Sequence, residues 1–177
     1  MTTTEDHRFP APLAAALAVR LKRIGEDDID FEPYDSFLSA EETTDWFQAW
    51  TGNDEVTGDE FRVFGQDGSG GYVAFWLARA GRELVEQPVV FLGSEGETGV
   101  VAQDLAAFLW LLADGYGPGE AVAPHAPDPD WTPRLDNDLA AIAERFGADR
   151  RASVLEIIAQ AAREFPDFDD TIMELCR

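Results

Sequence analysis

The sequence contains one cysteine, two histidines and 13 basic residues among 177, whereas 35 residues are acidic. The single thiol, Cys176, excludes an internal disulfide and a cysteine-ligated zinc site. Hydrophobic runs are short, and none approaches the roughly 20 residues that span a bilayer. A short apolar stretch near the start is followed by basic residues rather than preceded by them, which is the wrong order for a secretory signal. We therefore expect a cytoplasmic protein that does not span a membrane.

The shortage of basic residues leaves a formal net charge of −22 at pH 7. Such a surface repels nucleic-acid phosphate and anionic lipid, so we expect neither nucleic acid nor a membrane as a partner. It attracts basic proteins and raises the rate at which they encounter it. The same acidity also fits a role in solubility, a high-salt habitat or a proteome-wide bias, and these interpretations stay open at this point.

Two helices are predicted in the first third of the chain. Over residues 11–24 apolar side chains recur at helical spacing, and Gly25 is a natural stop. The stripe expected to face the core is Leu13, Leu17, Leu21 and Ile24. Ser39 followed three residues later by Glu42 is a capping box, which begins a second helix that should end before Gly52. The aromatic residues of this helix are Trp46, Phe47 and Trp50.

Beyond residue 60 the apolar pattern changes to the alternation that is typical of strands. The segment GQDGSGG, between the first two of these strands, contains the Asp-Gly pair of a hairpin loop. The expected strands are 61–65, 72–77, 88–94 and 99–102. Because no long helical crossover separates them, we predict an α+β fold with a twisted, mainly antiparallel sheet of four or more strands, flanked by helices.

The remaining segments complete a single globular unit over residues 1–177. The helix expected at 104–115 is apolar nearly all round, which indicates that it is covered on both sides. We place an α+β core at 26–121, a proline-rich linker at 122–134 and a helical C-terminal extension at 135–177. The helices of the extension are expected to cover the outer side of the apolar helix.

Motifs for catalysis or cofactor binding are weak. The glycines of GQDGSGG lack the following helix that a dinucleotide fingerprint requires. His7 and His125 lie in an N-terminal tail and a proline-rich loop, where packing would not orient a ring for a Ser/His/Asp triad. Cys176, in the segment MELCR, has mostly acidic neighbours, which disfavour a thiolate. We therefore expect no enzyme activity, no cofactor and no metal, although abundant carboxylates leave a carboxylate-based hydrolase as an alternative.

Acidic loop residues are the candidates for binding a partner, because loops carried by a rigid sheet often hold binding residues. The first candidates are Glu95 and Glu97, in the turn SEGE between two strands, together with Asp67 in the glycine-rich loop. The second are in the acidic segment 26–35, namely Asp27, Asp28 and Asp30.

Three segments carry a resemblance to a known family: FGQDGSGGYVAFWL, PVVFLGSEGE and VVAQDLAAFLWLLADGYGP. With FEPYDSFLSAEETTDWFQAWTGN upstream, they resemble the SUKH superfamily, which includes the Smi/Knr cell-wall regulators, over residues 30–121. The resemblance implies a twisted antiparallel sheet flanked by helices, and the role of an immunity protein that neutralises a cognate polymorphic toxin, often a nuclease or deaminase. It transfers no catalytic or binding residue. The sequence departs from the family in lacking a clear LP-x-D/E-Y segment, to which Glu32-Pro33-Tyr34 comes nearest, and in its helical tail.

The sequence thus predicts a non-catalytic, acidic protein-binding module whose partner is a basic toxin domain. Nuclease toxins are commonly basic because they hold phosphate, and an acidic surface would draw them in. An intracellular scaffold or regulator of the Smi/Knr type is the alternative. In that alternative, exposed tryptophans would matter more than carboxylates. The tryptophans in question are Trp46, Trp50 and Trp131.

Overall fold

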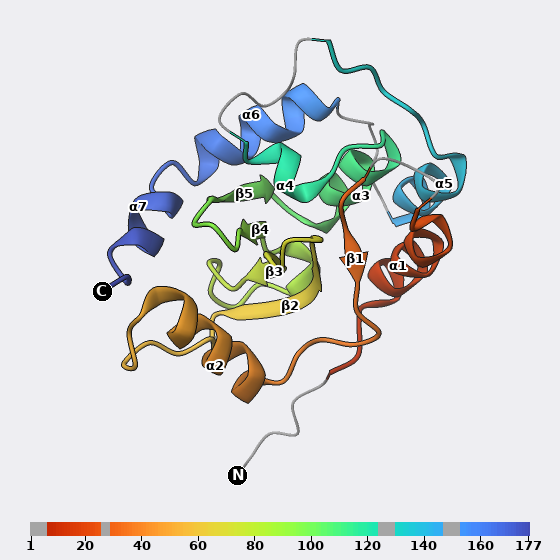
Figure 1. Ribbon diagram of the computed structural model, residues 1–177. Coiled ribbons are helices and arrows are strands. Elements are labelled where there is room, and N and C mark those ends of the chain that lie inside the picture. The colour runs from red at the N-terminus through yellow and green to blue at the C-terminus, as the bar shows by residue number, and fades with distance from the viewer. Residues whose placement is uncertain (1–6, 26–28, 124–129, 147–152) are drawn as a thin grey trace.

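A five-stranded sheet lies at the centre of the computed structural model, which describes residues 7–25, 29–123, 130–146 and 153–177 (Figure 1). Its strands are β1 (Glu32–Pro33), β2 (Phe61–Gln66), β3 (Tyr72–Trp76), β4 (Val89–Leu92) and β5 (Thr98–Ala102). They are hydrogen-bonded in chain order, and every neighbouring pair is antiparallel. The sheet is open and packed with helices, which confirms the predicted α+β class.

Strand β1 was not among the predicted strands, and it contains Pro33, a residue that usually interrupts regular structure. Proline is tolerated at the edge of a sheet, where its missing N–H leaves no central ladder bond unmade. β1 is such an edge strand: Glu32 pairs with Gln66, and Pro33 pairs with Gly65. The four predicted strands are confirmed, and none of their ends differs from the prediction by more than two residues.

The helices surround this sheet on both faces. They are α1 (Ala11–Arg23), α2 (Ala40–Thr51), α3 (Leu105–Ala113), α4 (Pro118–Ala121), α5 (Asn137–Phe146), α6 (Val154–Glu164) and α7 (Phe168–Met173), with a 3-10 turn, η1 (Leu84–Glu86). The capping box of α2 is confirmed: the Ser39 hydroxyl accepts from the Glu42 N–H at 3.1 Å, and the Glu42 carboxylate accepts from the Ser39 N–H at 2.9 Å. Gly52 ends α2 with a φ of 65°, in the left-handed region. None of the described helices is long and apolar enough to cross a membrane.

Alternating side chains of the strands divide between two cores. Phe64, Phe75 and Phe91 point into the larger core, which they share with α1, α3, α5 and α6. Nearly every residue of α3 is buried there, as its all-round apolar character predicts. In Figure 1, α1 and α5 lie side by side on one flank of the sheet, away from α2.

The second core lies on the opposite face of the sheet. Val63 and Leu92 point into it from the strands, Phe47 reaches it from α2, and Phe168 and Ile172 reach it from α7. The prediction that the C-terminal helices cover α3 is therefore confirmed for α5 and α6, but it is wrong for α7. Of the predicted linker at 122–134, residues 124–129 lie outside the described part of the chain.

Helix α1 buries a different stripe from the one predicted. Leu13 and Leu17 are buried, but Leu21 and Ile24 are both 44% exposed. Arg20 is buried instead, with 1% of its surface exposed. Its guanidinium donates to the carbonyl oxygen of Ile29 at 3.1 Å and to that of Phe31 at 3.4 Å. These hydrogen bonds offset the cost of burying the charge, and they fix the segment that leads into β1.

Candidate partner-binding surface

The β2–β3 loop is shaped by Asp67, one of the predicted binding residues. The Asp67 Oδ1 accepts from the Ser69 N–H at 3.0 Å, from the Ser69 hydroxyl at 2.8 Å and from the Gly71 N–H at 2.7 Å. Asp67 is half-buried, so this carboxylate holds the loop in its turn as well as adding negative charge to it.

The acidic segment before β1 is hydrogen-bonded to the same loop through Asp30. The Asp30 Oδ1 accepts from the Gly68 N–H at 2.7 Å, and the Asp30 side chain is otherwise exposed. A Cβ atom added at Gly68 would lie 3.1 Å from this oxygen, so the close approach favours glycine at residue 68. Asp27 and Asp28, also predicted as binding residues, lie outside the described residues.

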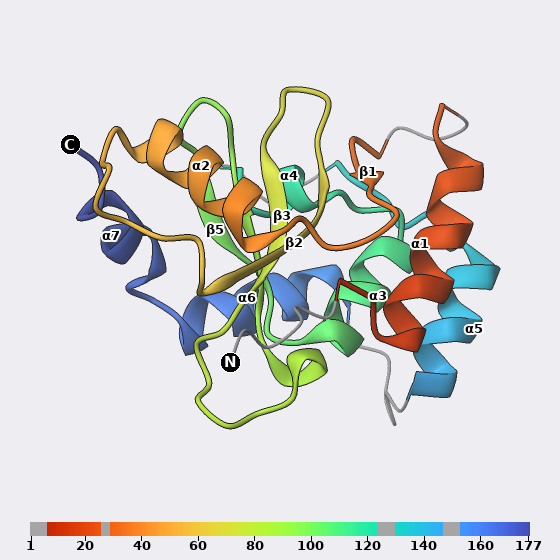
Figure 2. The same cartoon turned by 90° about the horizontal axis from the view of Figure 1, so that it is seen from below.

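The β4–β5 loop lies beside the β2–β3 loop. The Ser94 hydroxyl donates to the Ser69 hydroxyl at 2.9 Å, and Figure 2 shows both loops projecting from the same end of the sheet. Glu95 and Glu97 in this loop are exposed, as predicted. The structure therefore brings together all the described members of the predicted set, which are Asp30, Asp67, Glu95 and Glu97. We refer to these four residues as the acidic loop end.

An aromatic cluster adjoins the acidic loop end on the α2 face of the sheet. It consists of Tyr34, Trp46, Trp50 and Tyr72, and we call it the aromatic patch. The ring centroid of Trp46 lies 4.2 Å from that of Tyr72 and 5.5 Å from that of Trp50, with the planes nearly parallel. The Trp50 indole Nε1 donates to the Gly93 carbonyl oxygen at 2.8 Å, which joins the patch to the β4–β5 loop. All four side chains are half-buried.

The aromatic patch was only partly visible in the sequence. The spacing of Trp46 and Trp50 places them on one edge of a helix, but nothing local connects them to Tyr34 and Tyr72. Strand register places Tyr72 on the face that α2 covers, because residues paired across a sheet point to the same face. One such row crosses all five strands and runs Glu32, Gln66, Tyr72, Leu92 and Thr98.

Carboxylates act on the phenol end of the aromatic patch. The Tyr34 hydroxyl donates to the Gln66 Oε1 at 2.7 Å. Burial raises the pKa of Tyr34 above its usual value, and Tyr72 and the carboxylates of Glu32 and Glu42 raise it further. Burial is also the main cause that raises the pKa of Tyr72. Burial, the largest cause, disfavours a charge of either sign at the phenols, whereas the two carboxylates by themselves would favour a cation beside them.

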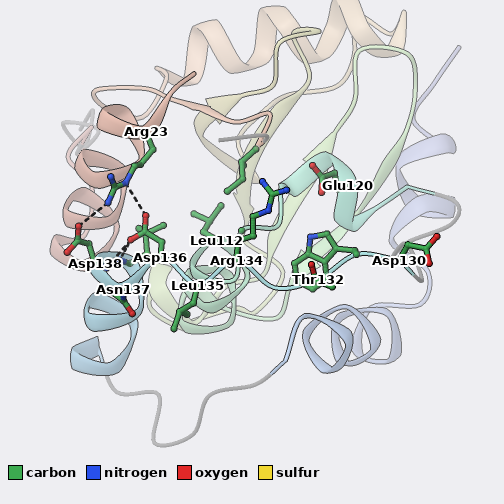
Figure 3. Close-up of a pocket in the computed structure, with 14 residues that line it drawn as sticks. Arg23, Leu112, Glu120, Asp130, Thr132, Arg134, Leu135, Asp136, Asn137 and Asp138 are labelled. Carbon is green, nitrogen blue, oxygen red and sulfur yellow. Dashed lines mark hydrogen bonds and ion pairs between the residues drawn. The ribbon is translucent and has the colours of Figure 1, made fainter. Parts of the chain in front are cut away.

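A pocket of about 750 Å³ lies between α1, α3 and the segment that leads into α5 (Figure 3). Arg23 forms ion pairs of 3.2 Å with both Asp136 and Asp138 at its rim. The Asp136 Oδ1 also accepts from the N–H groups of Asp138 and Leu139 at the start of α5. These charges join α1 to α5, so they are engaged in holding the fold together.

The third predicted tryptophan and the two histidines do not belong to the acidic loop end or to the aromatic patch. Trp131 lines this pocket and packs edge-on against Tyr116, with ring centroids 4.8 Å apart, so it belongs to the larger core. His7 lies with its Nδ1 3.3 Å from the Phe37 carbonyl oxygen. His125 lies outside the described residues. Among the described residues, no group of three or more His, Cys, Asp or Glu side chains is placed to hold a metal ion.

Comparison with known proteins gives no match to a family model, to a curated protein or to a solved structure. Membership of the SUKH superfamily therefore stays a prediction. The α+β class agrees with the fold that the resemblance implies, but many unrelated functions share that class, so the fold does not specify the function.

Proposed function

We propose that this protein is a non-catalytic, immunity-type module that binds a basic toxin domain and thereby neutralises it. The observation that carries the proposal is the Ser94–Ser69 contact, which places the two acidic loops side by side at one end of a rigid sheet. Asp30 adds the segment before β1 to the same end through its bond to Gly68. Carboxylates from three separate parts of the chain thus converge where a partner can reach them.

The charge of the whole chain supports the same proposal. At a net charge of −22, the electrostatic field of the protein attracts a basic domain from a distance. The exposed Glu95 and Glu97 are then available for direct contact with that domain. A toxin that binds nucleic acid needs a positive active-site surface, and an acidic module that covers this surface competes with the substrate. Binding of this kind needs no reacting group in the module.

A scaffold or regulator of the Smi/Knr type is a second candidate, and the aromatic patch favours it. Half-exposed Trp46 and Trp50 are the kind of side chains that dominate the binding energy of protein interfaces. This candidate differs in its partner, which would be a cellular protein with no toxin gene beside the gene for this chain.

The test is co-purification with the toxin domain encoded beside the gene, followed by measurement of association rates. We expect the complex to form quickly at low salt, and the association rate to fall as salt is added. Glu95→Lys should lower the association rate about tenfold. The matched control is Glu144→Lys, which makes the same charge change at an exposed residue of α5 and should have a much smaller effect.

The proposal is wrong if no neighbouring toxin domain binds at low salt, or if binding leaves the toxin fully active. Equal effects of the Glu95 and Glu144 variants would also contradict it, because the acidic loop end would then have no special role. Binding of a cellular protein in the absence of any toxin partner would favour the scaffold.

A further inference from the structure

The aromatic patch and its two neighbouring carboxylates have the composition of a receptor for a planar cation. Glu32 is exposed on β1 and, through the row that it shares with Gln66 and Tyr72, lies on the same face as the patch. Glu42 is exposed on the first turn of α2, the helix that carries Trp46. Glu42 precedes Trp46 by four residues in α2, so these two side chains are neighbours on the helix surface. Both carboxylates also contribute to the raised pKa of Tyr34.

We propose that the aromatic patch receives an arginine side chain from an exposed segment of the partner polypeptide, with Glu32 and Glu42 as its counter-charges. The guanidinium group is flat, so it lies against aromatic rings and offers several N–H donors to carboxylates at the same time. It is also less strongly hydrated than an ammonium group, which lowers the cost of placing it on a half-buried surface. This inference rests on the proposed function and names the chemistry that the partner presents.

The acidic loop end and the aromatic patch adjoin each other, and they contribute to different steps of binding. The acidic loop end is exposed, so its charges act mainly on the encounter with the partner and are screened by salt. The aromatic patch is half-buried and held in place by the Trp50–Gly93 bond, so it has little side-chain freedom to lose on binding. The patch therefore governs how slowly the complex dissociates, and the loops govern how quickly it forms.

The patch is tested with octa-arginine, octa-lysine and a Gly/Ser peptide of the same length, using calorimetry and tryptophan emission on the whole protein. We expect octa-arginine to bind several-fold more tightly than octa-lysine, and the Gly/Ser peptide not to bind. The double variant Glu32→Gln/Glu42→Gln removes charge but keeps the shape of the side chains, and glutamine still completes a capping box. This variant and Trp46→Leu should each weaken octa-arginine binding about tenfold.

Matched controls separate the patch from general attraction between opposite charges. Glu144→Gln removes a charge on α5, and Trp131→Leu removes a half-buried indole from the larger core, so both should leave octa-arginine binding unchanged. If Trp46→Leu does not fold, Trp46→Phe and the glutamine double variant decide the matter, because neither removes packing on a large scale. The inference is wrong if arginine and lysine peptides bind equally, or if the patch variants behave like the controls.

The failure of this inference and the failure of the proposed function give different results. If the toxin domain binds wild-type protein and the Trp46 and glutamine variants equally well, the arginine site is wrong and the toxin-binding function stands. If the patch prefers octa-arginine as expected but no toxin domain binds, the function is wrong and the arginine site stands.

Discussion

Trp50 donates from its indole Nε1 to the carbonyl oxygen of Gly93 at 2.8 Å, and this bond connects α2 to the β4–β5 loop. The loop carries Glu95 and Glu97, and Trp50 stacks on Trp46 within the aromatic patch. A single side chain therefore belongs to the patch and positions the acidic loop. The two surfaces for which we propose a shared partner are linked by a specific hydrogen bond.

Replacing Trp50 with phenylalanine keeps an aromatic ring but removes the donor. We expect Trp50→Phe to lower the free energy of unfolding by about 1 kcal/mol, the usual net value of one such hydrogen bond. Amide exchange in residues 93–97 should become faster, because the loop loses its attachment to α2. Trp76→Phe is the control, since Trp76 packs in the same core but in contact with Phe165 and Phe168, and it should leave loop exchange unchanged. Unchanged loop exchange in Trp50→Phe would contradict the prediction.

The capping box of α2 should make stability depend on pH. Hydrogen bonds from the N–H and hydroxyl of Ser39 hold the pKa of Glu42 below its usual value. The folded state therefore favours the carboxylate, and this contribution is present above the ordinary pKa of a glutamate, about 4.3, and is lost as the pH falls through the lowered folded value.

Ser39→Ala should cost about 1 kcal/mol of unfolding free energy at neutral pH, as the loss of a helix cap usually does. The cost should shrink as the pH is lowered, because protonation of Glu42 removes part of the same interaction from the wild type. Urea unfolding from neutral to acidic pH measures both effects. Ser36→Ala, at an exposed serine outside the helix, is the control, and its free energy of unfolding should change with pH as that of the wild type does. If the cost of Ser39→Ala is the same at every pH, the capping box is not coupled to the ionisation of Glu42.

The features that could be predicted from the sequence depend on short-range chemistry. The capping box at Ser39 and Glu42 needs only residues three apart, and the hairpin at Asp67-Gly68 needs only the preference of that pair for a turn. The apolar residues all round α3 predict that this helix is buried, but they do not predict which elements pack against it. The exposed loop position of Glu95 follows from the strands on either side of it.

The features that were missed depend on partners far apart in the chain. Arg20 is buried because the carbonyl groups of Ile29 and Phe31 lie within its reach, and no periodicity contains that information. Tyr72 meets Trp46 because the strand register turns Tyr72 toward the face of the sheet on which α2 packs. The aromatic patch was therefore beyond a reading based on helix and strand periods alone.

The two tyrosines of the patch should ionise above the normal range for phenols. Burial raises the pKa of Tyr34, and the neighbouring Tyr72, Glu32 and Glu42 add to this shift. A spectrophotometric titration of wild type minus Tyr34→Phe isolates this phenol, which should remain neutral when an ordinary tyrosine, with a pKa of about 10, has ionised. A difference curve centred at the ordinary value would contradict the expected environment. The Glu32→Gln/Glu42→Gln variant should move the curve down in pH.

The same shift predicts how stability changes in alkali. Unfolded Tyr34 releases its proton near pH 10, whereas folded Tyr34 does so only at higher pH, so the unfolded state binds fewer protons between these values. The free energy of unfolding should therefore fall as the pH rises above about 10, and it should fall less steeply in Tyr34→Phe. An equally steep fall in both proteins would contradict this sign.

The buried Arg20 of α1 should contribute strongly to stability, although several of its neighbours in this helix are exposed. Arg20→Met fills the same space but leaves the carbonyl groups of Ile29 and Phe31 without these donors. We expect a loss of about 2–4 kcal/mol in the free energy of unfolding. Lys22→Met is the control at an exposed residue of α1 and should change stability by no more than about 0.5 kcal/mol. Because Asp30 lies between the two carbonyl groups, amide exchange at Gly68 should also become faster, and unchanged stability would refute the role given to Arg20.

Phe168 tests whether α7 belongs to the same cooperative unit as the sheet. Phe168 is 2% exposed in the second core, its ring centroid lies 4.9 Å from that of Trp76, and the neighbouring Asp169 accepts from the Thr98 hydroxyl at 2.7 Å. Phe168→Ala should therefore lower the free energy of unfolding by about 3–5 kcal/mol, as the removal of a buried phenylalanine usually does. Met173→Ala, in the same helix but at a residue that is 55% exposed, should stay within about 0.5 kcal/mol of the wild type.

The shape of the unfolding curve then decides between one unit and an appended extension. If α7 is part of the cooperative fold, Phe168→Ala shifts one transition, and tryptophan emission and far-ultraviolet circular dichroism report the same midpoint. If α7 unfolds by itself, the main transition stays where it is, and a separate early step precedes it in circular dichroism and in the emission of Trp76, which Phe168 contacts. The contact of Phe168 with Trp76, the last residue of the central strand β3, favours the single transition, because loss of this ring would expose more of Trp76 to water.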